Sequence, residues 1–299
     1  MPPESEERQG LILILVSTLA YGTLPIVGKA AYAAGVRPEP LLAWRFVIAA
    51  VLFALLSRGK GPPVTFRQRL VLWGLGVVFV VNALAYFTAL QTVPAATVAL
   101  LIYTYPVIVT LLSGIAGLDP LTPRGLVGAG LAVAGCALTA TGEIAGGAGV
   151  AYALVSAFVY ATYVVLSSRF ASGVPSLTAA LHLAQSSAVV CIGWALFHGS
   201  GLSVPASLQA WAAIVALAVI STVVALRAFL AGMARVGPAR ASVLSSLEVV
   251  VTMVFAVLLL GERLSLRQGA GALLILGAVA FQNLATVRRL RLPGRRASG

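Results

Sequence analysis

Ten long apolar runs, separated by short polar connections, dominate this sequence. An α-helix rises about 1.5 Å per residue, so roughly 20 apolar residues cross the hydrocarbon core of a bilayer. The runs lie at residues 11–33, 40–57, 70–90, 95–117, 122–141, 147–168, 176–198, 208–232, 239–260 and 267–287. The longest connection, 58–69, is too short for a separate soluble domain. The sequence therefore predicts an all-α membrane protein with ten transmembrane helices.

Composition also indicates a membrane protein, and it limits the kinds of partner that the chain is expected to bind. Hydrophobic residues make up 60% of the chain and charged residues only 9%, whereas soluble domains carry about 25% charged residues. The net charge of +12 is best interpreted as an orientation signal and as contact with anionic lipid, so no nucleic-acid partner is expected. Cys136 and Cys191 lie inside apolar runs and form no CxxC spacing. We expect neither a metal site nor a cofactor.

The distribution of Lys and Arg predicts the orientation. With the N-terminus inside, 14 of the 20 basic residues fall on cytoplasmic segments and only Arg37, Arg263 and Arg267 on the outer side. This bias favours cytoplasmic N- and C-termini by the positive-inside rule. The run 11–33 is longer than a signal-peptide core and follows an acidic segment, so we interpret it as a retained helix. We expect a multi-pass protein of the cell (inner) membrane.

The sequence contains an internal repeat. The pattern LVSxxxYxT occurs at residues 15–23 and again at 154–162, and further matches follow in the same order at offsets of 142 and 143 residues. We divide the chain into a cytoplasmic N-terminus (1–10), a first repeat (11–142), a second repeat (147–287) and a basic cytoplasmic tail (288–299). Because each repeat holds five spans, the second enters the membrane in the opposite sense. Inverted-topology repeats are typical of secondary transporters.

The segment LGERLSLRQGAGALLILGAV (260–279), the glycine-rich last helix of each half and the two five-helix halves resemble the EamA-type drug/metabolite transporter superfamily. Within it, the chain is most similar to YddG-type aromatic amino-acid exporters. The resemblance implies a central cavity lined by the first, third, fourth, sixth, eighth and ninth helices, with the fifth and tenth packing the halves together. We expect a monomer to be the functional unit. Members often have proline where this chain has Glu248, as the matching position Pro106 still does.

Several of those helices carry polar and aromatic side chains at helical spacing. Ser156, Tyr160, Tyr163 and Ser167 form one stripe, which we expect to face either the cavity or a neighbouring helix. Tyr103 and Tyr105 are two residues apart, so we expect them to point to different faces and not to line a narrow site together. Pro25 and Pro106 are expected to interrupt their helices. The candidate substrate-binding residues are Tyr21, Asn82, Tyr86, Tyr103, Tyr160, Tyr163, Ser246 and Glu248.

Glu248 is an acid inside an apolar run, more than two helical turns from either end of 239–260. A charged side chain at such a depth costs roughly 3 kcal/mol on insertion scales. Glu248 is therefore interpreted as a proton-coupling group, as a charge that recognises a substrate ammonium, or as a neutral carboxylic acid bonded between helices. Desolvation favours this neutral form.

Three cations lie within the runs: Lys29, Arg45 and Arg227. All three are near helix ends, and their long stems allow the charge to reach the interface. Lys29 is retained as a candidate contact for a substrate anion.

Together these features predict a secondary transporter that exports small amphiphilic metabolites, with amino acids, including aromatic ones, as the expected substrates. Other metabolites or organic-cation drugs remain the alternative. A nucleotide sugar calls for several deep cations. A membrane-embedded lipid-modifying enzyme calls for clustered acids, histidines or a metal set, which this chain lacks. We therefore expect no enzyme.

Overall fold

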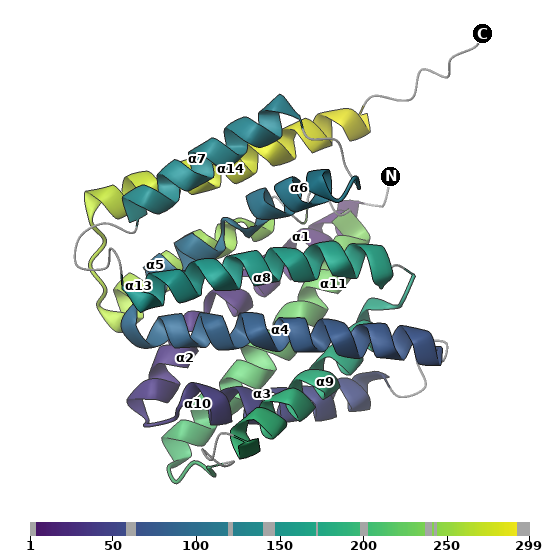
Figure 1. Ribbon diagram of the computed structural model, residues 1–299, viewed down its shortest axis with the longest axis vertical. Coiled ribbons are helices and arrows are strands. Elements are labelled where there is room, and N and C mark those ends of the chain that lie inside the picture. The colour runs from purple at the N-terminus through teal and green to yellow at the C-terminus, as the bar shows by residue number, and fades with distance from the viewer. Residues whose placement is uncertain are drawn as a thin grey trace.

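The computed structural model describes residues 4–57, 64–118, 122–139, 147–171, 173–197, 203–236, 241 and 244–291, without the side chains of 124 and 282–291. All the elements in these ranges are helices (Figure 1). The first half contains α1 (Glu4–Gly22), α2 (Leu24–Ala33), α3 (Pro38–Ser57), α4 (Phe66–Thr92), α5 (Ala95–Ile102), α6 (Tyr105–Ile115) and α7 (Pro123–Thr139). The second contains α8 (Ala148–Phe170), α9 (Ser176–Phe197), α10 (Leu208–Ala218), the π-helix η2 (Val219–Val224), α11 (Ala225–Val236), α13 (Leu247–Leu260) and α14 (Leu266–Arg291). In the predicted basic tail, 292–299 lie outside the described residues, as do the side chains of 288–291.

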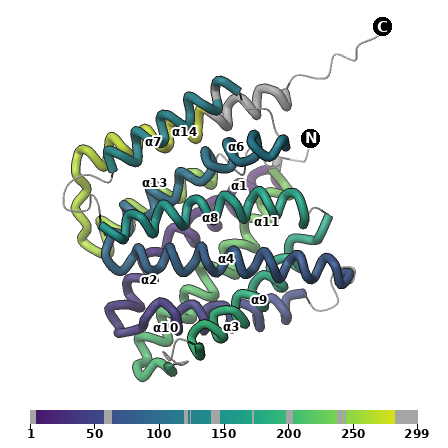
Figure 2. Tube along the Cα trace, viewed as in Figure 1, coloured from purple at the N-terminus to yellow at the C-terminus, as the bar shows by residue number. Residues whose placement is uncertain are grey.

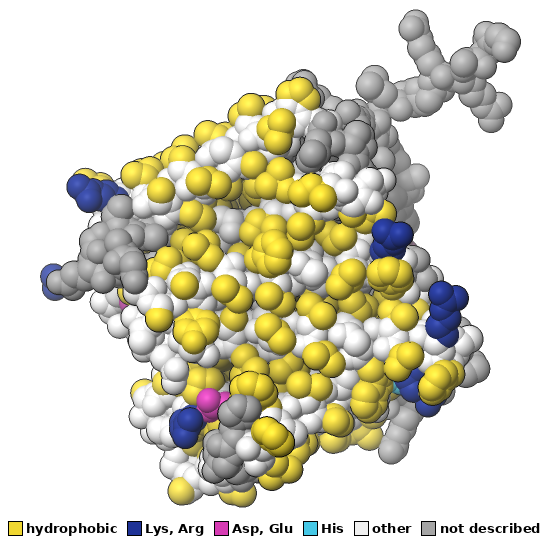
Figure 3. All heavy atoms as spheres, viewed as in Figure 1, with side chains coloured by type: hydrophobic (Ala, Val, Ile, Leu, Met, Phe, Trp, Pro, Cys, Tyr) yellow, Lys and Arg dark blue, Asp and Glu magenta, His cyan; other side chains and the backbone are white. Residues whose placement is uncertain are grey.

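The helices confirm a multi-pass membrane protein. Joined across their breaks, seven helical segments of the described chain are long and apolar enough to span a bilayer, and three shorter apolar helices cover 125–139, 247–260 and 266–281. Large apolar side chains such as Leu258 and Leu273 lie exposed. In the face drawn in Figure 3, apolar side chains cover the middle, and Lys and Arg gather at two opposite edges. The count of ten spans and their orientation stay predictions.

Three helical runs are interrupted. Thr23 separates α1 from α2 just before Pro25, and Thr104 separates α5 from α6 just before Pro106. These two breaks confirm the prediction from proline. A third break, at Ser246, precedes α13 and was not predicted. Ser246 lies 142 residues after Thr104, which is the offset of the sequence repeat, so both halves break this helix at corresponding positions.

The helices pack in pairs that include one element from each half. α1 packs on α11, α4 on α8, α3 on α9, α5 on α13 and α7 on α14. Figure 2 shows α7 and α14 side by side at one edge of the molecule. A Cβ at Gly135 of α7 would lie 2.8 Å from the carbonyl oxygen of Gly271 on α14, so the absence of a side chain permits this close approach. By contrast, Gly269 and Gly277 have open space where a Cβ would be.

Candidate functional site

A cavity of about 1330 Å³ lies between the two halves. Residues of α1, α4, α5, α6, α8, η2, α11 and α13, the helices implied by the resemblance, line it, and so do Pro123 and Gly125 of α7 and Val279 of α14. The pair α3 and α9 also contributes, through residues such as Phe53 and Leu183. This contribution was not predicted, and it follows from the direct packing of α3 on α9 across the halves.

Seven of the nine candidate site residues line this one cavity: Tyr21, Asn82, Tyr86, Tyr103, Tyr160, Tyr163 and Glu248. The other two are not among its lining residues. Lys29 is half-buried elsewhere on α2, and Ser245 takes the place on the cavity wall that was expected for Ser246. The backbone carbonyl of Ser245 accepts a hydrogen bond from the Tyr103 hydroxyl at 2.9 Å. Ser245, the residue before the break at Ser246, is therefore part of the cavity wall.

The expectation that Tyr103 and Tyr105 point to different faces was wrong. Both line the cavity, and their ring centroids lie 5.8 Å apart in an edge-to-face arrangement. The expectation assumed a continuous helix. Because Tyr103 directly follows the last residue of α5 and Tyr105 begins α6, the break between the two helices changes the angular relation between them. Tyr105 is therefore a cavity residue that reasoning from the sequence missed, and the nearby Pro106 was the signal that could have identified it.

Aromatic rings form a continuous wall through the cavity. Tyr105 lies edge-on to Tyr160 with centroids 4.7 Å apart, and Tyr160 stacks on Tyr163 at 5.9 Å. The series continues from Tyr163 to Phe79 at 5.3 Å, and from Phe79 to Phe46 at 6.0 Å. Such a surface combines apolar ring faces with hydroxyl groups, which suits a flat amphiphilic molecule.

The polar stripe of α8 faces both the cavity and a neighbouring helix. The Ser156 hydroxyl donates a hydrogen bond to Oδ1 of Asn82 on α4 at 2.7 Å, whereas Tyr160, Tyr163 and Ser167 line the cavity. Ser156 thereby fixes the amide of Asn82, which itself lies on the cavity wall. The two alternatives left open by the sequence are thus both realised along one stripe.

Glu248 lies on the cavity wall, in the first turn of α13. It has no ion-pair or hydrogen-bond partner among the described residues. The helix starts only at Leu247, so Glu248 is not deep within a continuous helix, as the unbroken apolar run suggested. A helix N-terminus carries a partial positive charge, which favours a carboxylate there. Glu248 therefore combines access to the cavity with a position that tolerates its charge.

Arg45 corrects the expectation that the deep cations reach the membrane interface. Its side chain is only 5% exposed, and it lines the cavity. Its Nε donates a hydrogen bond to the Thr222 hydroxyl at 3.0 Å, and its guanidinium lies 5.2 Å from the ring centroid of Phe46. Arg227, in contrast, is exposed. The sequence alone did not distinguish the two because packing by α4 and η2 decides where Arg45 points.

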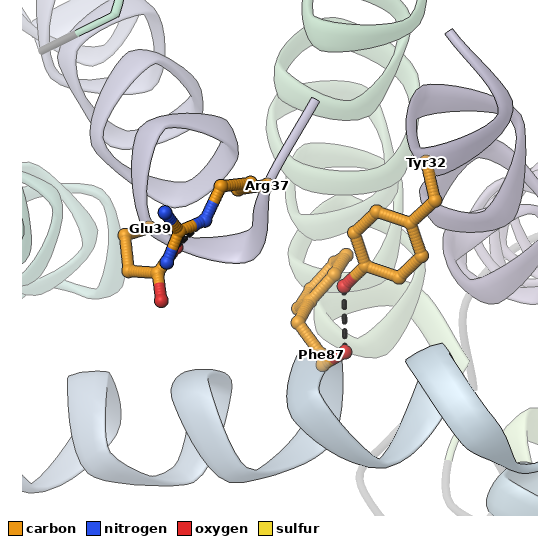
Figure 4. A network of polar contacts seen from close by, with 4 residues as sticks. All are labelled: Tyr32, Arg37, Glu39 and Phe87. Atoms are coloured by element: carbon orange, nitrogen blue, oxygen red, sulfur yellow. Dashed lines mark hydrogen bonds and ion pairs between the residues drawn. The ribbon is translucent and has the colours of Figure 1, made fainter. Parts of the chain in front are cut away.

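We call one end of the helix bundle the closed end. It contains the connections 34–37, 93–94 and 261–265. Here the Tyr32 hydroxyl of α2 donates a hydrogen bond to the Phe87 carbonyl of α4 at 2.6 Å (Figure 4). Both carboxylate oxygens of Glu262 accept hydrogen bonds from the first turn of α5. The cavity extends instead toward the opposite end, where Thr122 and Ser176 line it.

Comparison with known proteins identifies a family model that matches both halves of the chain, and individual relatives. The profile of the EamA-like transporter family matches twice, over residues 8–141 and 147–284. The chain is 28% identical over 280 residues to the uncharacterized transporter YcbK of Bacillus subtilis, covering 89% of this chain and 90% of that protein. It is 32% identical over 219 residues to the aromatic amino acid exporter YddG of Ancylobacter novellus, covering 69% and 71%. A solved crystal structure, 23% identical, has a similar fold with a TM-score of 0.64, covering 95% of this chain and 99% of the other.

Proposed function

Because the chain belongs to the EamA-like transporter family, we propose that it is a secondary transporter that exports small amphiphilic metabolites, aromatic amino acids among them. The observation that carries this proposal is the cavity between the halves. Its wall of tyrosine and phenylalanine rings contains one acid, Glu248, and one cation, Arg45, among the described lining residues. A zwitterion with an apolar ring has matching chemistry.

We propose that ten spans form two inverted five-helix repeats with both termini in the cytoplasm. The helix pairs support this arrangement. Suppose that the helices of the two halves correspond in order, the first to the first and so on. Interchanging the halves then converts the pair α1–α11 into the pair α8–α4, and it leaves the pairs α3–α9 and α7–α14 unchanged. That is the pattern of a two-fold relation between the halves. Two such halves provide alternating access by exchanging conformations.

In this orientation the cavity faces the cytoplasm and the closed end faces outward. The exposed arginines Arg67, Arg69 and Arg169 lie at the end toward which the cavity extends, as the positive-inside rule requires of a cytoplasmic surface. A substrate from the cytoplasm therefore enters the cavity directly. We place the protein in the inner membrane as a monomer, with its basic tail on anionic lipid.

Two other substrate classes fit the cavity less well. A nucleotide sugar carries at least two negative charges, and Arg45 is the one cation among the described lining residues. An organic cation would pair with Glu248 but would meet the positive charge of Arg45 in the same cavity. A zwitterionic amino acid complements both charges.

Efflux from cells tests the proposal. Bacteria expressing the protein are loaded with labelled phenylalanine by feeding a phenylalanine-containing dipeptide, and the label that appears outside is followed. We expect faster efflux than from cells with the empty vector, and a smaller effect for labelled alanine. Efflux equal to the vector control, with the protein shown to be in the membrane, would contradict the proposed function.

A further inference from the structure

Arg45 is a buried cation on the wall of the cavity. It is 5% exposed, and no Asp or Glu of the described residues forms an ion pair with it. An uncompensated charge in the membrane interior is costly, so such a residue normally has a partner or meets a ligand. Its environment therefore points to an anion that is brought in from outside the protein.

The guanidinium of Arg45 is held in place by a hydrogen bond at its Nε edge and by aromatic rings near its guanidinium carbon. Nε donates to the Thr222 hydroxyl at 3.0 Å, and that hydroxyl donates onward to the Leu217 carbonyl at 2.9 Å. The rings of Phe46 and Phe87 lie 5.2 and 5.6 Å from the guanidinium carbon. Cation–π contacts of this kind stabilise the charge without using its N–H groups.

The terminal nitrogens of Arg45 remain available. Within the described residues, the bond from Nε is the hydrogen bond that Arg45 makes, and neither Nη1 nor Nη2 is an occluded, unpaired atom. Both therefore face the cavity that Arg45 lines. Two parallel N–H donors in a plane match the two oxygens of a carboxylate.

The position of Thr222 depends on the π-helix. η2 interrupts the α-helical path between α10 and α11, and the Thr222 hydroxyl bonds to the carbonyl five residues earlier. Single π-helical turns are frequent at functional sites. Thr222 and its neighbour Ser221 both line the cavity, so the irregular turn provides the support for the Arg45 side chain.

We infer that Arg45 is the carboxylate-binding residue of the cavity, anchored by Thr222 and flanked by Phe46 and Phe87. The ligand is a monocarboxylate whose apolar group lies against the aromatic wall. Arg45 lies toward the closed end, because its guanidinium contacts Phe87, which is five residues before the end of α4. A molecule that enters from the open end therefore crosses much of the cavity before its carboxylate reaches Arg45. The inference deepens the proposed function and depends on it only for the identity of the physiological ligand.

Ligand binding to the purified full-length protein in lipid nanodiscs tests this inference. The probes are 3-phenylpropionate and its neutral isostere 3-phenylpropanamide, measured by calorimetry in the wild type and in Arg45→Gln. Charge-assisted hydrogen bonds contribute enough to predict a loss of about tenfold or more in carboxylate affinity. We expect amide affinity to stay within about twofold, because its hydrogen bonds involve no second charge.

Two further variants keep the test informative. Arg227→Gln removes an exposed arginine of α11, in the helical run that contains Thr222, and should leave both affinities unchanged. Arg45→Lys keeps the charge but loses the planar pair of donors, so carboxylate binding should be several-fold weaker. Equal carboxylate affinity in the wild type and the Arg45 variants, or no preference of the wild type for the carboxylate, would overturn the inference. Binding is measured without flux, so a failure of the transport proposal is seen separately.

Discussion

The carboxylate of Glu262 caps the helix that begins at Ala95: its Oε1 accepts a hydrogen bond from the Ala95 N–H at 2.6 Å. Its second oxygen accepts one from the Ala96 N–H at 3.1 Å. Glu262 belongs to the second half of the chain and α5 to the first. A carboxylate at a helix N-terminus satisfies free N–H groups and the partial positive charge there. The contact therefore ties the two halves together at the closed end.

Removing this cap should favour opening of the closed end. Glu262→Ala loses two charge-assisted hydrogen bonds, which contribute about 1.5–3 kcal/mol each. The readout is the labelling rate of a cysteine in place of buried Val36, in a background lacking Cys136 and Cys191, with a membrane-impermeant maleimide. We expect faster labelling in the Glu262→Ala protein.

A matched control for this prediction is Glu39→Gln. Glu39 pairs with Arg37 at 3.5 Å at the same end (Figure 4), but both residues belong to one local segment. The substitution should leave labelling at position 36 unchanged. An equal increase in both variants would show that charge at this end, and not the cap on α5, controls access.

The aromatic wall should determine affinity for aromatic substrates. Tyr160 contacts both Tyr105 and Tyr163 through its ring. We expect Tyr160→Phe to keep the half-saturation constant for phenylalanine within about twofold and Tyr160→Ala to raise it by about two- to tenfold, the range of an aromatic pair. Tyr152→Ala, on the same helix but exposed, should have no effect. The prediction is wrong if Tyr152→Ala and Tyr160→Ala impair transport equally.

Glu248 has two candidate roles on the cavity wall, proton coupling and binding of a substrate ammonium, and one substitution separates them. Because its carboxyl lines the cavity without a protein partner among the described residues, it is free to exchange a proton with the cavity. Glu248→Gln resembles the protonated form permanently. If Glu248 carries the coupling proton, the variant should lose uptake driven by a pH gradient while exchange at equal pH persists. Loss of both activities would instead indicate a role in substrate binding.

The α7–α14 contact should depend on Gly135. A Cβ at this position would lie 2.7 Å from Ile275 Cγ1 and 2.8 Å from the Gly271 oxygen. Gly135→Val should therefore separate the helices and destabilise the protein by about 1–3 kcal/mol, as overpacking does. Gly130 lies on the same helix with open space beside it, so Gly130→Val should be tolerated. Thermal unfolding in detergent compares the two, and an equal change in both variants would contradict the packing role.

Periodicity and composition predicted the helices, and seven of the nine candidate site residues lie on the wall of one cavity. Tyr21, Asn82, Tyr86 and Tyr160 were recognised because polar and aromatic side chains at helical spacing are conspicuous in an apolar run. Helix breaks limited the prediction elsewhere. The breaks at Thr104 and Ser246 changed which side chains share a face, so Tyr105 and Ser245 were missed.

The role of Arg45 could not be predicted because tertiary contacts decide it. In the sequence, Lys29, Arg45 and Arg227 look alike, each within reach of a helix end. Only the packing of Phe87 and the π-helical Thr222 around the guanidinium separates Arg45 from the others. No regular pattern predicts a π-helix in the run 208–232. The one cation on the described cavity wall was therefore among those assigned to the interface.

Counterflow in liposomes tests the central claim most directly. Purified protein is reconstituted into vesicles loaded with unlabelled phenylalanine, with equal pH and salt on both sides, and trace labelled phenylalanine is added outside. We predict transient accumulation of the label that saturates with concentration and is inhibited by tryptophan but not by a nucleotide sugar. No accumulation above protein-free vesicles, either at equal pH or with an imposed pH gradient, would contradict the assignment as an aromatic amino-acid transporter.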